Sequence, residues 1–88
     1  MTHAPVTSIS DLRTLDPEEM MEGYVAGLHG ASEPDDAQPR AFWHGWRTGM
    51  LAAGLRVRDE ADSALARSFV AAARMHLRIV EDAWGESA

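Results

Sequence analysis

The chain contains no cysteine and no long run of apolar residues. Without cysteine it has no disulfide, no thiolate nucleophile and no cysteine-based zinc site, and the redox compartment stays open, with the cytosol favoured. No apolar segment approaches the roughly 18 residues that cross a bilayer, and the polar start of the chain lacks the basic and apolar blocks of a signal peptide. We therefore expect a soluble, cytoplasmic protein with no membrane partner.

Lysine is also absent, so all 8 cationic side chains are arginine, against 14 acidic side chains and a net charge of −6. An acidic chain repels phosphate backbones, which disfavours general nucleic-acid binding and confines any RNA contact to a local site. The bias towards arginine and alanine is typical of a GC-rich bacterial or phage genome. A domain of 88 residues buries only about 60–65 % of its unfolded surface, so we expect self-association, most simply as a homodimer.

The sequence offers little chemistry for a catalytic site. No serine lies in a nucleophile elbow, no glycine run has the form of a phosphate loop, and no carboxylate pair stands apart from the other acids. His29 and His44 lie near Asp35 and Asp36 in the sequence, but without the ligand spacing that known metal sites require. We expect neither enzymatic activity nor a metal or cofactor.

Two segments share one pattern, residues 23–28 (GYVAGL) and residues 45–50 (GWRTGM): glycine, aromatic residue, two residues, glycine, apolar residue. A glycine inside a helix costs about 0.5–1 kcal/mol relative to alanine, and close approach of two helices is the natural compensation. The pattern predicts a helical hairpin in which the Tyr24 and Trp46 rings cover the glycines of the opposite helix. The expected packing residues are Gly23, Tyr24, Gly27, Trp43, Gly45, Trp46 and Gly49.

The predicted fold class is all-α: a hairpin of two glycine-rich helices packed on a long third helix. We expect a flexible tail over residues 1–10 and a single helical domain over residues 11–88. Within that domain the apolar periodicity predicts helices over residues 16–29, 40–53 and 59–83.

Helix ends are marked clearly. Asp16 followed by Pro17 is a strong start, with a capping carboxylate and a proline in the first turn. Gly30 is expected to end the first helix as a left-handed cap, and Gly54 is expected to end the second helix. Asp59 is expected to cap the third helix.

The third helix has an apolar side wider than the ~100° that one packing surface normally covers, which suggests a second surface buried against another copy or a partner. His76 lies on that side and is expected to be a structural histidine with a hydrogen-bond partner. Arg67, Arg74 and Arg78 lie on the polar side, expected to be a solvated face with ion pairs along the helix. The candidate dimer face consists of Leu65, Phe69, Val70, Leu77, Val80 and Trp84.

Trp43 and Trp46 allow two interpretations. Two indoles beside an arginine could stack exposed RNA bases, but packing in the core of the hairpin is the favoured interpretation. On the other side of the same helix, Arg40, His44 and Arg47 are the candidate contacts to RNA or to a protein partner.

The segment 22–30 (EGYVAGLHG), followed after a proline-containing loop by residues 43–47 (WHGWR), resembles the ribosome modulation factor family. The similarity covers about residues 20–50. It implies a two-helix hairpin, ribosome binding that silences translation, and contact with ribosomal RNA.

The favoured function is a small non-catalytic interaction or regulatory protein that presents a helical surface to a protein partner. A ribosome-associated translation modulator, as the resemblance implies, is the first alternative. The second is an acidic phage inhibitor that mimics nucleic acid, because carboxylates concentrate in the first helix and the following loop. These carboxylates belong to Glu18, Glu19, Glu22, Glu33, Asp35 and Asp36.

Overall fold

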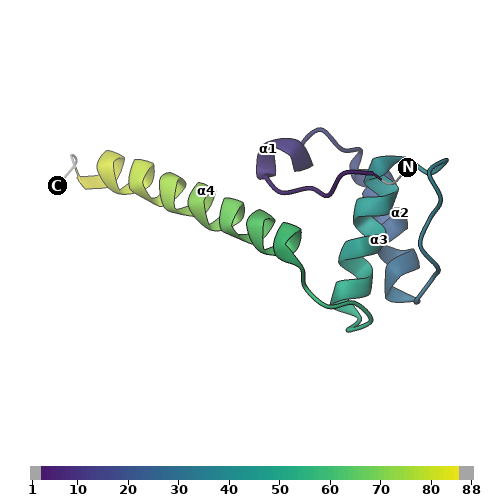
Figure 1. The fold of residues 1–88 in the computed structure, drawn as a ribbon. Coiled ribbons are helices and arrows are strands. Elements are labelled where there is room, and N and C mark those ends of the chain that lie inside the picture. Colours follow the sequence, from purple (N-terminus) through teal and green to yellow (C-terminus); the bar gives the residue numbers. More distant parts are fainter. Residues whose placement is uncertain (1–2, 86–88) are drawn as a thin grey trace.

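The computed structural model describes residues 3–85, and every regular element in that range is an α-helix. In chain order these are α1 (Ile9–Leu12), α2 (Pro17–Leu28), α3 (Arg40–Ala52) and α4 (Glu60–Gly85). Helices α2 and α3 pack side by side as a hairpin, and α4 extends away from them (Figure 1). The all-α prediction is confirmed, and the observed bounds of α2, α3 and α4 lie within two residues of the predicted ones. The single turn of α1 was not among the three predicted helices.

The ends of α2 and α3 follow their local sequence. The Asp16 carboxylate accepts a hydrogen bond of 2.8 Å from the Glu18 backbone N–H, which satisfies a free donor of the first turn of α2. Gly30 and Gly54 have φ angles of 76° and 75°, the left-handed conformation that glycine adopts without strain. Both glycines therefore end their helices as the sequence predicts.

The hairpin is held by glycines that face backbone across the helix pair. A Cβ atom added to Gly23 on α2 would collide with the Phe42 carbonyl of α3, with its carbon only 2.8 Å away. A Cβ on Gly45 of α3 would collide with the Met20 carbonyl of α2 in the same way. The relation is reciprocal, so each helix leaves room for the main chain of the other.

The second glycine of each motif repeats this contact one turn further along. A Cβ on Gly27 would meet the Trp46 carbonyl, and a Cβ on Gly49 would meet the Tyr24 carbonyl. The atoms nearest to all four glycines belong to the opposite backbone. We expected the rings of Tyr24 and Trp46 to cover these positions; main-chain atoms occupy them instead, because the two helices approach more closely than a ring permits.

The N-terminal segment differs from the predicted flexible tail. Its described part, residues 3–10, lies against α3, with Val6 buried at 3 % exposure. The Arg40 guanidinium donates through Nε to the Ala4 carbonyl at 2.8 Å and through both terminal nitrogens to the Asp11 carboxylate at 2.6 and 2.8 Å. Residues 1–2 lie outside the described range. One arginine and the buried Val6 thus hold this segment against the hairpin.

The packing of the hairpin on the long helix is more limited than the sequence suggested. The chain measures 55 × 24 × 21 Å, because only the first turns of α4 lie near the rest of the molecule (Figure 1). Besides the loop that leads into α4, the described contacts include a hydrogen bond of 3.0 Å from the Ile9 N–H to the Ser68 hydroxyl. The later turns of α4 project beyond the hairpin, so their apolar side chains stay exposed.

Four charged side chains join α3 to the start of α4, and we name them the junction cluster. Arg56 donates to both oxygens of Asp62 at 2.9 Å, and Arg47 donates to Asp59 at 2.9 Å. Asp59 and Asp62 also accept each other's backbone N–H at 3.0 and 2.9 Å, a reciprocal cap on α4. The Arg47 guanidinium, and then the Asp62 N–H, hold the pKa of Asp59 well below its usual value. The junction cluster thus sets where α4 begins and how it leaves the hairpin.

We predict that Gly45→Ala destabilises the protein by about 2–3 kcal/mol, because the new methyl group must push apart two backbones. Helix propensity alone predicts the opposite, a gain of about 0.5–1 kcal/mol. Urea unfolding measures the difference. The control is Thr48→Ala on the exposed side of the same helix, expected to stay within about 0.5 kcal/mol of the wild type. A Gly45→Ala protein as stable as the wild type would contradict the proposed contact.

We predict that Asp62→Ala loosens the start of α4, because it removes the acceptor of Arg56 and one half of the reciprocal cap. Loss of a cap costs about 1 kcal/mol, so the amides of the first two turns of α4 should exchange with solvent roughly five- to tenfold faster. Hydrogen exchange measured by mass spectrometry or NMR checks this. Asp82→Ala, on an exposed turn of the same helix, is the control, and equal exchange in both variants would refute the role of Asp62.

Candidate functional site

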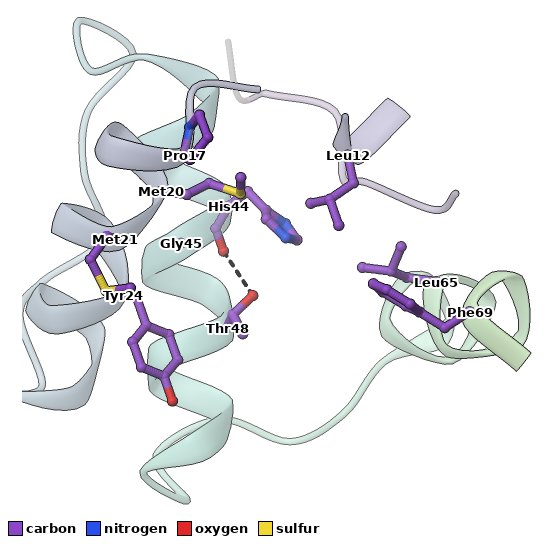
Figure 2. A pocket seen from close by; sticks show the side chains of 10 residues that line it. All are labelled: Leu12, Pro17, Met20, Met21, Tyr24, His44, Gly45, Thr48, Leu65 and Phe69. Atoms are coloured by element: carbon purple, nitrogen blue, oxygen red, sulfur yellow. Dashed lines mark hydrogen bonds between the residues drawn. The ribbon is translucent and has the colours of Figure 1, made fainter. Parts of the chain in front are cut away.

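A groove with a volume of about 440 Å³ lies between the hairpin and the first turns of α4. In Figure 2, Met20, Met21 and Tyr24 line it from α2, and Leu65 and Phe69 face them from α4. It is almost entirely apolar, since most of its wall consists of methionine, leucine, proline and aromatic side chains. The complete lining is Leu12, Pro17, Met20, Met21, Tyr24, His44, Gly45, Thr48, Leu65 and Phe69.

His44 is the histidine among these residues. It is half-buried, and its Nδ1 atom is buried without a hydrogen-bond partner among the described residues. Burial is the first cause that lowers the pKa of His44 below its ordinary value of 6.5, and the nearby charges of Arg47 and Arg40 lower it further. The imidazole is therefore neutral at pH 7 and presents no charge to the groove.

The two arginines predicted to contact RNA or a partner are engaged within the chain. Arg40 holds the N-terminal segment and Asp11, and its hydrogen bonds lower the pKa of the Asp11 carboxyl. The Arg47 side chain is only 13 % exposed, pairs with Asp59, and lies with its Cζ atom 5.1 Å from the centre of the Trp43 ring. Arg40, His44 and Arg47 all lie on α3, but they do not form an open basic surface.

Both tryptophans of α3 are core side chains. Trp43 is 5 % exposed and Trp46 is 8 % exposed. The Trp43 indole N–H donates to the Glu33 carboxylate at 3.1 Å, and the Trp46 indole N–H donates to the Ala31 carbonyl at 2.7 Å. Their ring faces are not available for stacking on bases, and both N–H groups hold the loop between α2 and α3 onto the hairpin.

The predicted dimer face of α4 is largely open. Phe69 is 50 % exposed, Leu77 57 % and Trp84 75 %, while Leu65 and Val80 are half-buried. His76 is exposed, which differs from the partnered structural histidine expected from the sequence. Projection of α4 into solvent explains the difference, because water can satisfy the imidazole there.

The polar side of α4 carries an exposed ion pair in its first half, between Arg67 and Glu60 at 2.7 Å. Such pairs contribute little to stability. Among residues 3–85 no group of three or more His, Asp or Glu side chains could hold a metal ion. Over the same range, no helix is both long enough and apolar enough to cross a bilayer.

The groove was not foreseen from the sequence. Its residues come from α1, α2, α3 and α4, so no local spacing brings Leu12, Met21 and Phe69 together. The adjacent Met20 and Met21 were the available signal, because flexible thioether side chains are common on surfaces that bind apolar partners.

Comparison of the chain with protein-family models, with curated proteins and with solved structures found no match. The resemblance to the ribosome modulation factor family stays a prediction.

We predict that the free energy of unfolding falls as the pH drops below 6.5, partly because of His44. The unfolded chain then takes up a proton that the folded chain excludes, so stability is lost on acidification through this window. Urea unfolding between pH 7 and pH 5 should show a shallower decline for His44→Gln. His29→Gln, an exposed position at the end of α2, is the control. A decline of equal slope in wild type and His44→Gln would rule out this role.

Proposed function

We propose that the protein is a small non-catalytic interaction protein that presents a helical surface to a protein partner. The observation that carries the proposal is the apolar groove between α2 and the start of α4. Met21 is 62 % exposed and Phe69 is 50 % exposed at its two sides. Contiguous exposed apolar side chains of this kind mark binding surfaces on soluble domains.

Charge supports a protein partner over a nucleic acid. The net charge is −6, and Arg40, Arg47 and Arg56 form ion pairs with carboxylates of the same chain. A phosphate backbone would therefore meet few free cations on the hairpin. An apolar segment of a protein, such as one face of an amphipathic helix, matches the groove better.

The two alternatives receive less support. The glycines and tryptophans that resemble the ribosome modulation factor family are used in hairpin packing, which needs no ribosome. For the nucleic-acid mimic, Glu33 accepts the Trp43 indole N–H and Asp35 accepts the Ala37 backbone N–H. These two carboxylates therefore stabilise the loop between α2 and α3.

We predict that Met21→Glu abolishes capture of the protein partner, because it places a charge in the apolar groove. The experiment uses immobilised wild type, Met21→Glu and Val57→Glu with an extract of the source organism, and mass spectrometry identifies what each retains. Val57 is 86 % exposed and lies outside the groove lining, so Val57→Glu is the matched control. Circular dichroism checks that all three proteins are folded.

Proteins retained by the wild type and Val57→Glu but lost with Met21→Glu support the proposal. Retention of the same proteins by all three contradicts the groove as the binding surface. Retention of ribosomal components that nuclease treatment abolishes would favour the translation modulator instead.

A further inference from the structure

A second apolar surface runs along α4. It shares no residue with the groove lining, although Ala66 and Val70 are next in sequence to Leu65 and Phe69 of the groove. Its six positions are spaced by four, three, four, three and four residues, the alternation of a heptad repeat, and every one is apolar. This spacing is typical of helices that pair as a coiled coil. We name these positions the α4 seam: Ala66, Val70, Ala73, Leu77, Val80 and Trp84.

The α4 seam is open in the single chain. Val70 is 49 % exposed, Leu77 57 % and Trp84 75 %. Figure 1 shows the later turns of α4 beyond the hairpin. Exposed leucine and tryptophan side chains at heptad spacing, over about 28 Å of helix, are unfavourable in water.

We propose that the α4 seam pairs with the α4 seam of a second copy of this chain, with the two helices antiparallel. Side-chain size favours a second copy in that orientation. Centring the pair between residues 73 and 77 places Trp84 of each copy opposite Ala66 of the other and Leu77 opposite Ala73. Every large side chain then meets a small one, and the valines meet each other, so the layers fill evenly.

A parallel pair fits worse. It would place the two Trp84 side chains against each other, while Ala66 and Ala73 would each meet their own copy. The layer with two tryptophans would be overpacked and the layers with two alanines would leave cavities. Overpacking and cavities both destabilise a helix pair. The order of residue sizes along the seam therefore selects the antiparallel arrangement.

The surface of α4 is hollowed at the place where this arrangement puts the largest side chain. A concavity of about 410 Å³ is lined by Ala66, Arg67, Val70, Ala71 and Arg74. In the antiparallel pair, Trp84 of the second copy enters at the level of Ala66, beside this hollow. An indole is suited to such a site, because tryptophan anchors many interfaces by filling a pocket on the partner.

Charges at the edge of the seam agree with the same geometry. Position 67 of one copy faces position 81 of the other, so Arg67 meets Glu81 at both ends of the pair. In the single chain Arg67 pairs with Glu60, but both side chains are more than 60 % exposed. Replacing Glu60 by Glu81 of the second copy as the partner of Arg67 therefore costs little free energy. At the centre of the pair, Arg74 of one copy faces Arg74 of the other. This is the one contact between like charges at these edge positions.

The first test is the oligomeric state of the full chain by sedimentation equilibrium at roughly 10–200 µM, the range in which a short coiled coil of moderate affinity assembles. We expect a reversible monomer–dimer equilibrium. Leu77→Glu should raise the dissociation constant at least about 100-fold, because it buries a charge in the seam. Met75→Glu is the control: Met75 is 67 % exposed on the opposite side of the same helix, and its dissociation constant should change less than about threefold.

The second test is the orientation, and the absence of native cysteine makes it direct. Val70→Cys and Val80→Cys are nearly isosteric changes in one expected layer. An equimolar mixture, oxidised mildly, should form mainly the mixed disulfide if the helices are antiparallel. Each variant should cross-link mainly with itself if they are parallel.

A wild type that stays monomeric throughout the concentration range overturns the inference. Equal effects of Leu77→Glu and Met75→Glu on the dissociation constant also overturn it. So do disulfides that join two molecules of the same cysteine variant. None of these results bears on the groove, since Met21→Glu tests partner capture on α2. Loss of capture with Met21→Glu in a monomeric protein would uphold the proposed function and reject the dimer.

Discussion

The contact on which the rest of the structure depends is main chain against main chain between α2 and α3. Gly23 and Gly27 face carbonyls of α3, and Gly45 and Gly49 face carbonyls of α2. Such proximity leaves all four glycines buried or nearly in contact with the opposite main chain even though the domain is small. Because the opposing atoms are backbone, no side-chain substitution on one helix can make room for a methyl group on the other. A substitution of any of the four glycines therefore cannot be compensated by a second substitution on the opposite helix.

The rest of the chain is arranged around this hairpin by arginines. Arg40 fastens the N-terminal segment, and Arg47 with Arg56 fixes the start of α4. The pairs of Arg47 and Arg56 with Asp59 and Asp62 lie where α4 leaves the hairpin, and the groove lies between the hairpin and the first turns of α4. Arg40 and Arg47, which the sequence indicated as RNA contacts, act instead as internal connectors, and the groove beside them is apolar.

Much of the fold could be predicted from the sequence because its signals are local. Asp16 and Pro17 start a helix, Gly30 and Gly54 end helices, and the spacing of Gly23, Gly27, Gly45 and Gly49 indicates close packing of two helices. The helix ends need only residues within one or two turns, where short-range geometry decides the outcome. The pairing of the helices follows from one motif that recurs on two helices joined by one loop.

The candidate surface could not be predicted in the same way. Whether Arg40 meets solvent or the carbonyl of Ala4 depends on residues 36 positions apart. The groove depends on the angle at which α4 leaves the hairpin, which the junction cluster sets. For the same reason the exposed state of His76 was missed: an apolar helix face predicts burial, but not which neighbour, if any, covers each turn.

The three tryptophans report by fluorescence on two separate parts of the molecule. Trp43 and Trp46 lie in the hairpin core at 5 % and 8 % exposure, while Trp84, at 75 % exposure, stands near the far end of α4. Their intrinsic emission therefore combines a blue-shifted signal from the interior with a red-shifted one from a single solvated indole. Quenching by iodide, which reaches only the solvated ring, separates the two signals without any label.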